Sequence, residues 1–203
     1  MFIDFGSRVI QIKIVLYGPA MSGKTTALNL LFKKFNSPLI SINTSHTQEA
    51  RTLFYDYGYI VMNIGNWSLK LNLWSATGQD FYCMTRSTVL QGTDGILFMA
   101  DSQNRVLEEN IKSYKELKDF FGHNLENNIP VVICLNKRDL KNVISFEKFK
   151  EVFSILSKSV IFETIALRNG KNVYQSFNLL FRQILEFHKD IYNTIQKEIS
   201  FDN

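Results

Sequence analysis

One short loop constrains the fold of this chain more than any other feature. The loop is Gly18-Pro19-Ala20-Met21-Ser22-Gly23-Lys24-Thr25. It fits the phosphate-binding pattern G-x-x-x-x-G-K-[ST], which requires a strand before it and a helix after it. The alternating residues 10–16 predict that strand, and residues 25–35 predict that helix. The sequence therefore predicts a loop whose backbone N–H groups and helix N-terminus point at a phosphate.

Three side chains at the end of this loop are candidates for contact with a nucleotide. We expect Lys24 to bridge the β- and γ-phosphates, which makes it a candidate catalytic residue, and we expect the Thr25 hydroxyl to ligate Mg²⁺. Thr26 is a further candidate contact to the nucleotide. The alternative is a glycine-rich turn that carries a surface lysine.

A second motif, Asn136-Lys137-Arg138-Asp139, predicts which base is bound. It follows the apolar residues 131–135, and nucleotides bind at the carboxyl ends of such strands. The two oxygens of Asp139 match the N1–H and amino donors of guanine, whereas adenine would leave this carboxylate unpaired. Asn136 can bond the far edge of the base, and the stem of Lys137 can cover its plane. The alternative is a charged loop between a strand and a helix.

Strand-like and helix-like segments alternate along the chain. Strands are expected at residues 10–16, 57–64, 67–74, 96–100, 131–135 and 160–162. Helices are expected at residues 25–35, 104–121, 145–156 and from Val173 onward. Gly65-Asn66 is a hairpin signal between two strands. This order predicts an α/β P-loop NTPase with a mostly parallel six-stranded sheet, one antiparallel edge hairpin and helices on both faces.

Length and charge give weaker predictions. At 203 residues the chain is expected to form a single domain, residues 1–203. Its net charge is +4 with an isoelectric point near 9.0, but the lysines are spread out, which favours solvated helix faces over a nucleic-acid partner. Residues 187–203 carry apolar side chains at helical spacing. They predict an amphipathic tail for a partner, a longer core helix or a frayed end.

The two cysteines, Cys83 and Cys134, favour a reducing compartment over a disulfide framework. No apolar run approaches the ~20 residues of a membrane span. Signals for secretion and for lipid attachment are missing as well, so we expect a cytoplasmic protein without a direct membrane anchor.

Residues 75–79, Ser-Ala-Thr-Gly-Gln, stand where a Ras-like GTPase would carry Asp-x-x-Gly-Gln. Gly78 would give its backbone N–H to the γ-phosphate, and Gln79 would position the attacking water. The alternative is an ordinary loop after a strand.

Several segments resemble the MglA family of bacterial and archaeal Ras-like GTPases. They are residues 2–8, 13–26, 51–56, 94–103 and 136–140, so the resemblance covers about the first 140 residues. It implies a Ras-like G domain with GTP or GDP and Mg²⁺ as ligands. It also implies a switch for cell polarity and motility, slow in hydrolysing GTP without a roadblock-type activating partner of the MglB kind. Effectors would read the GTP-bound surface, and partners would recruit the protein to a cell pole or membrane.

The resemblance also carries residue roles. Thr52 resembles the switch threonine that joins Mg²⁺, and Arg51 resembles an arginine proposed to act in cis, although a solvated loop arginine is the alternative. The backbone N–H of Ala166 would bond the guanine oxygen. Ser75 replaces the usual aspartate, as in other MglA proteins, and Ala20 stands where the family usually has glycine.

Two other functions remain open at this stage. A scaffold or regulatory subunit that holds GTP with little hydrolysis is suggested by Ala20 and Ser75, while Gln79 argues against it. A small-molecule or nucleoside kinase would share the phosphate loop, but the guanine motif argues against that class.

Overall fold

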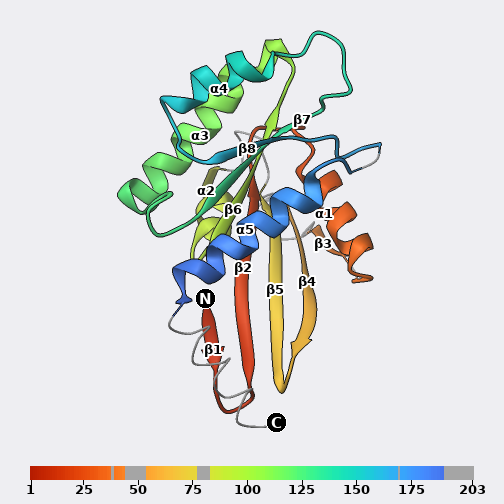
Figure 1. Cartoon of the computed structure of the whole chain (residues 1–203), viewed down its shortest axis with the longest axis vertical. Helices are drawn as coiled ribbons and strands as arrows, with labels where there is room; N and C mark the ends of the chain where they lie inside the picture. The colour runs from red at the N-terminus through yellow and green to blue at the C-terminus, as the bar shows by residue number, and fades with distance from the viewer. Residues whose placement is uncertain (38, 44–53, 77–82, 169, 190–203) are drawn as a thin grey trace, which may run out of the picture.

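The computed structural model describes residues 1–37, 39–43, 54–76, 83–168 and 170–189. Four predicted site residues, Arg51, Thr52, Gly78 and Gln79, lie outside these ranges, as do residues 190–203 of the predicted tail. The described part contains a mixed sheet with helices on both of its faces (Figure 1).

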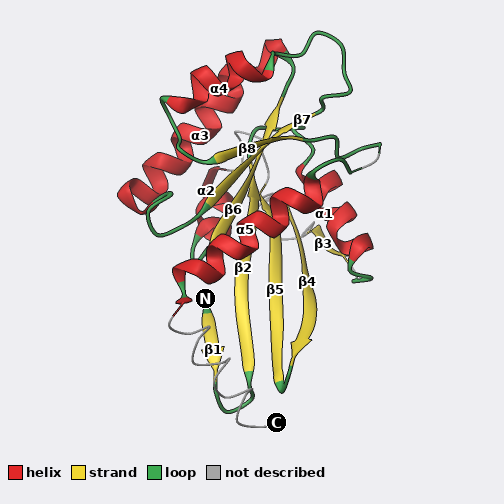
Figure 2. Cartoon of the chain, viewed as in Figure 1, coloured by secondary structure: helices red, strands yellow, loops and turns green. Residues whose placement is uncertain are grey.

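The described elements alternate as expected, and Figure 2 separates the helices from the strands. The strands are β1 (Phe2–Asp4), β2 (Val9–Tyr17), β3 (Leu39–Asn43), β4 (Phe54–Ile64), β5 (Trp67–Ala76), β6 (Gly95–Asp101), β7 (Val131–Asn136) and β8 (Val160–Glu163). The α-helices are α1 (Lys24–Lys34), α2 (Cys83–Leu90), α3 (Leu107–Phe121), α4 (Phe146–Ser154) and α5 (Val173–Phe187). The 3₁₀ turns are η2 (Asn104–Val106) and η3 (Gly122–Asn124).

The strand order in the sheet is β3-β4-β5-β2-β6-β7-β8, and β1 pairs with β2 outside this path. Strands β5, β2, β6, β7 and β8 run parallel. The expected hairpin is confirmed, since β4 and β5 pair antiparallel with Ile64 opposite Trp67. The carboxyl ends of β2, β6 and β7 therefore meet at one edge of the sheet, where the two nucleotide motifs begin.

Within the described residues the sheet has eight strands, whereas the sequence predicted six. The two strands that were not predicted are β1 and β3. β1 is only three residues long and pairs with the first residues of β2, whereas β6 pairs with β2 from Ile14 onward. β3 has five residues and pairs antiparallel with β4. The hairpin is therefore not at the sheet edge. Strands this short carry too few alternating residues to be distinguished from loops.

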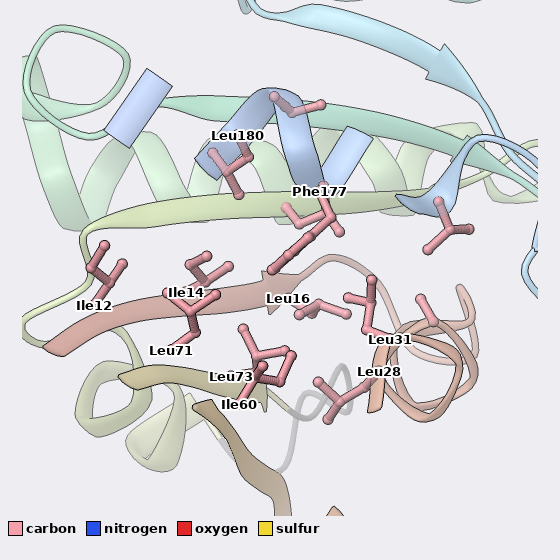
Figure 3. Close-up of a cluster of buried hydrophobic side chains, with 14 of the residues drawn as sticks. Ile12, Ile14, Leu16, Leu28, Leu31, Ile60, Leu71, Leu73, Phe177 and Leu180 are labelled. Carbon is pink, nitrogen blue, oxygen red and sulfur yellow. The ribbon is translucent and has the colours of Figure 1, made fainter. Parts of the chain in front are cut away.

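The helices cover the sheet in two layers, as predicted. α1 and α5 pack on one face, and α2, α3 and α4 pack on the other. Figure 3 shows the first layer, where Leu31 of α1 and Phe177 of α5 lie near Leu16 of β2. This packing follows from the alternation in β2, which directs Ile12, Ile14 and Leu16 toward α1 and α5.

The four predicted helices are confirmed, with small differences at their ends. α4 begins where the sequence predicts, because the Ser145 hydroxyl accepts a hydrogen bond of 3.2 Å from the Lys148 N–H. α2 was not predicted. Its eight residues include no acidic side chain in the first turn and no basic one in the last, so the usual end signals are missing.

Among the described helices, we find none whose length and apolar content would suffice to cross a lipid bilayer.

Candidate nucleotide-binding site

The loop Gly18–Thr25 connects the end of β2 to the start of α1. Gly18 has φ 136° and Gly23 has φ 100°, values that side chains rarely tolerate. Space is also limiting, because a Cβ on Gly18 would lie 2.2 Å from the carbonyl oxygen of Met99. A Cβ on Gly23 would lie 2.4 Å from Nδ2 of Asn136. Both glycines of the motif are therefore required by the way the loop packs on β6 and β7.

The start of α1 presents an uncapped helix N-terminus. Its N-cap is Gly23, no side chain caps the first turn, and no acidic residue lies in that turn. N–H groups at such an end attract an anion. Ser22, just before it, has a buried hydroxyl that lacks a hydrogen-bond partner among the described residues.

Lys24 is buried, and its ammonium folds back onto the loop. Nζ donates hydrogen bonds to the carbonyl oxygens of Gly18 at 2.9 Å and Pro19 at 2.6 Å. Burial, together with the positive charges of Arg86 and Lys137 and against the charge of Asp56, lowers the pKa of Lys24 from 10.5 to about 7. The loop thus disfavours the charged form of Lys24, which an approaching anion would stabilise.

Thr25 lies at the same end of α1 and contacts β4. Its hydroxyl donates a hydrogen bond of 2.6 Å to Oδ2 of Asp56. Asp56 is paired across the hairpin with Ser75, and Ser75 is in register with Leu16, close to the start of the loop. A carboxylate on β4 therefore lies near the position where Ser75 replaces the aspartate of Ras-like proteins.

Asn136 joins the two motifs. Its Nδ2 donates a hydrogen bond of 2.8 Å to the carbonyl of Ser22 in the phosphate loop. Its Oδ1 accepts hydrogen bonds from the Ala166 N–H at 3.0 Å and from the Thr164 hydroxyl at 3.2 Å. One buried amide thus connects the phosphate loop, the end of β7 and the segment after β8.

The charged side chains that follow Asn136 are paired with other segments. Nζ of Lys137 lies 2.6 Å from Oδ2 of Asp101 at the end of β6. Oδ2 of Asp139 lies 3.1 Å from Nε of Arg168, which follows β8. These contacts bring the carboxyl ends of three parallel strands to one place.

A cavity of about 280 Å³, here named the loop cavity, opens between the two motifs. Its lining residues are Met21, Gly23, Thr26, Asn136, Lys137, Asp139, Leu140, Ala166 and Leu167. Three large apolar side chains of this lining are exposed: Met21 at 87%, Leu167 at 79% and Leu140 at 42%. Exposed apolar groups beside a few polar groups are typical of a small-molecule site.

The family follows from sequence comparison, which matches residues 13–186 to the model of the Ras family. The chain belongs to the Ras family. As a Ras-family protein it is a GTP-binding small GTPase of the switch type.

Individual relatives of this Ras-family protein specify the branch. The mutual gliding-motility protein MglA of Myxococcus xanthus is 37% identical over 161 residues, which cover 75% of this chain and 80% of the relative. The Ras-related protein RABA4b of Arabidopsis thaliana is 28% identical over 188 residues, covering 92% of this chain and 75% of the relative. The GTP-binding nuclear protein GSP1 of Encephalitozoon cuniculi is 26% identical over 178 residues, covering 85% and 69% respectively. The Ras-family protein described here is therefore of MglA type.

The structure of this Ras-family protein brings most of the predicted contact residues together. Those that line the loop cavity or belong to the adjoining loop are Gly18, Pro19, Ala20, Met21, Ser22, Gly23, Lys24, Thr25, Thr26, Asn136, Lys137, Asp139 and Ala166. Arg51, Thr52, Gly78 and Gln79 lie outside the described residues.

Sequence reasoning missed several residues at this site. Asp56 and Arg168 contact predicted residues from distant parts of the chain, and Leu140 and Leu167 add apolar surface to the loop cavity. Leu140 directly follows the predicted Asp139, and Leu167 directly follows the predicted Ala166. Their positions could therefore have identified them as neighbours of the site. No local pattern marks Asp56 or Arg168.

Proposed function

We propose that this protein is a molecular switch that binds GTP and hydrolyses it to GDP and phosphate. The observation that carries the proposal is the hydrogen bond of 2.8 Å from Asn136 to Ser22, which fixes the guanine motif beside the phosphate loop. A nucleotide carries its base and its phosphates in one small molecule. A site that binds both must therefore hold the guanine motif and the phosphate loop close together. The loop cavity supplies the space between them.

The phosphate loop would bind the β- and γ-phosphates through its backbone N–H groups and through Lys24. The positive charges of Arg86 and Lys137 act on the buried Lys24 side chain, and the negative charge of Asp56 offsets them only in part. Binding of an anion beside Lys24 is therefore favoured. Lys24 would then exchange the carbonyl groups of Gly18 and Pro19 for phosphate oxygens. The ammonium needs no new space, since it already lies inside the loop.

The base would enter the loop cavity. Asp139 would accept hydrogen bonds from the N1–H and the amino group of guanine, and the Ala166 N–H would donate a hydrogen bond to the guanine oxygen. Leu167 and the stem of Lys137 would contact the faces of the ring, because both line the cavity. Asn136 would keep these groups in place.

Thr25 and Thr52 would hold Mg²⁺, and the oxygen donors at this end of α1 fit that ion. The Thr25 hydroxyl is a hard oxygen ligand of the kind that Mg²⁺ prefers, and the Asp56 carboxylate accepts its proton. When bound, Mg²⁺ neutralises charge on the β- and γ-phosphates. Because the Thr25 hydroxyl donates its proton to Asp56, its oxygen keeps both lone pairs and would be able to bind the ion without breaking this hydrogen bond.

Hydrolysis would depend on three residues outside the described part of the chain. Gln79 would position the attacking water, the Gly78 N–H would bond the γ-phosphate, and Arg51 would stabilise charge in the transition state. We infer slow turnover without an activating partner, because Ala20 adds a methyl group where the family usually has glycine.

The biological role is inferred from the similarity to the mutual gliding-motility protein MglA. We propose a cytoplasmic regulator of polarity or motility, recruited to a pole or membrane through partners. Its partners would be a roadblock protein of the MglB kind, as activator, and effectors that read the GTP-bound surface. Residues 1–203 would form a single G domain, with residues 187–203 as an extended helix or tail.

The test is nucleotide binding followed by a single turnover. We expect GDP to bind far more tightly than ADP, and Asp139→Ala to remove that preference. Loading with Mg·GTP should then give slow phosphate release, which a roadblock partner accelerates. Equal affinity for ADP and GDP would refute the guanine assignment, and phosphorylation of an acceptor molecule would indicate a kinase instead.

A second candidate is a protein that holds GTP without significant hydrolysis. It is favoured by Ala20, whose methyl group stands where the family usually has glycine, and by Ser75, which replaces the usual aspartate. Absence of phosphate release with and without the partner would support this candidate. In that case Ala20→Gly should restore release if the methyl group is the obstacle.

A further inference from the structure

The ion pair between Arg168 and Asp139 belongs to neither nucleotide motif. Nε of Arg168 lies 3.1 Å from Oδ2 of Asp139. The side chain of Asp139 is 13% exposed, whereas that of Arg168 is 72% exposed. A largely buried carboxylate is thus contacted by an arginine that extends from the surface.

Arg168 could either occupy the place of the base or hold Asp139 from outside the loop cavity. The direction of the contact distinguishes these two roles. If Arg168 occupied the place of the base, its guanidinium would line the loop cavity. The cavity is lined by Asp139 and Leu167, on either side of the contact, but Arg168 is not among its lining residues. The arginine therefore approaches the carboxylate from outside the cavity and leaves the inner side of Asp139 open.

We propose that Arg168 is a positioning residue for guanine recognition, which holds the carboxylate of Asp139 in place while the base occupies the loop cavity. The proposal rests on the proposed function, because it assumes that Asp139 reads guanine. It adds a residue that no motif contains.

Carboxylate chemistry allows both contacts at once. An ionised carboxylate has two oxygens and about four lone-pair sites, so guanine and Arg168 need not compete for the same one. A carboxylate already fixed by an ion pair loses less side-chain freedom when the base binds, and preorganisation of this kind increases affinity.

The other charges of the motif do not replace Arg168. Lys137 pairs with Asp101 at 2.6 Å, and Nε of Arg138 lies 2.7 Å from Oε1 of Glu163. Each of these cations is held by a carboxylate at the end of a different strand. Among the ion pairs of the described residues, the one that reaches Asp139 comes from Arg168.

The experiment compares GDP with inosine diphosphate, which lacks the 2-amino group and so makes one hydrogen bond fewer to Asp139. Dissociation constants are measured for the full chain, for Arg168→Ala and for Arg168→Lys. We expect Arg168→Ala to weaken GDP binding by about two- to fivefold, the range for an exposed ion pair. The affinity for inosine diphosphate should fall less, so the preference for GDP over inosine diphosphate should decrease. Arg168→Lys should restore part of this preference.

Arg182→Ala is the matched control, because Arg182 is an exposed arginine in the second half of α5 and does not line the loop cavity. It should leave both dissociation constants unchanged. A melting curve of each variant checks that the fold is intact, and Arg168→Gln serves if the alanine variant does not fold.

Two results would overturn the proposal. Tighter GDP binding by Arg168→Ala would mean that the arginine competes with the base. Equal weakening of both nucleotides would mean that Arg168 supports the loop without acting on Asp139. Failure of the proposed function gives a different result, since the unmodified protein would then not prefer GDP to ADP.

Discussion

The hydroxyl of Thr25 donates a hydrogen bond of 2.6 Å to the carboxylate of Asp56, which links the start of α1 to β4. The two residues are 31 positions apart in the sequence. Thr25 is also the residue that we propose for Mg²⁺. In this conformation the carboxylate on β4 accepts the hydroxyl proton, which leaves the oxygen lone pairs of Thr25 for a metal and places a negative charge beside that position.

We predict that Asp56→Ala increases the affinity for GTP relative to GDP at saturating Mg²⁺. Removing the carboxylate removes a negative charge that would repel the γ-phosphate, which GTP has and GDP lacks. We expect the ratio of the two dissociation constants to change by about tenfold, which corresponds to roughly 1.4 kcal/mol.

The measurement is a titration with fluorescent GTP and GDP. Asp119→Ala on the exposed side of α3 is the control, since it removes the same charge far from the loop. An unchanged ratio in Asp56→Ala would show that the contact with Thr25 has no influence on the nucleotide state.

The fold was largely predictable because its long elements carry clear patterns. β5 alternates apolar and polar side chains from Trp67 to Leu73, and the two-residue turn before it was recognised. α2, β1 and β3 were missed because each is short, and α2 also lacks the usual end signals. Their positions depend on pairing and packing with distant segments, which local patterns do not contain.

The site was predictable only where its residues are consecutive in the sequence. The phosphate loop and the segment Asn136–Asp139 follow local patterns, and the structure places them together. Asp56 and Arg168 act on these motifs from β4 and from the segment after β8. Contacts of this kind arise from the strand order of the sheet, so no spacing rule in the sequence would find them.

We predict that Asn136→Ala destabilises the nucleotide-free protein by about 2–6 kcal/mol. The substitution leaves the Ser22 carbonyl and the Ala166 N–H without their partner in a buried place, at about 1–3 kcal/mol each. Urea unfolding measures the free energy of unfolding directly.

Asn104→Ala is the control, because its hydrogen bond to the Asn142 carbonyl is exposed. Its loss should change the free energy of unfolding by less than ~1 kcal/mol. A loss below about 0.5 kcal/mol in Asn136→Ala would contradict its role as a connection between the loops.

We predict that Arg86→Ala loosens α2. Nη1 of Arg86 lies 2.6 Å from Oε2 of Glu116 on α3, and the Tyr17 hydroxyl donates to the same oxygen at 2.9 Å. Burial, and then the charge of Glu116, raise the pKa of Tyr17, so this phenol stays protonated and remains a donor. Losing the arginine removes the ion pair between α2 and α3.

Hydrogen exchange of the α2 amides is the measurement for this variant. We expect exchange to accelerate by about 5- to 30-fold, corresponding to a loss of about 1–2 kcal/mol. Lys115→Ala, on the exposed side of α3, should leave α2 unchanged. Unaltered protection of α2 in Arg86→Ala would show that other contacts hold the helix.

The last prediction concerns the protonation of Lys24, whose pKa is lowered to about 7, first by burial and then by the positive charge of Arg86. Above pH 7 the ammonium loses its proton in the native protein but keeps it in the unfolded chain up to its ordinary pKa of 10.5. The nucleotide-free protein should therefore gain stability as pH rises from about 7 to about 10.

A bound phosphate favours the charged form of Lys24, so GDP binding at pH 8 should be accompanied by uptake of roughly one proton. For the same reason the affinity for GDP should fall as pH rises. Calorimetry in two buffers of different ionisation enthalpy measures this uptake. Lys24→Met should abolish it, and a binding enthalpy independent of the buffer in the unmodified protein would mean that Lys24 is already charged before the nucleotide arrives.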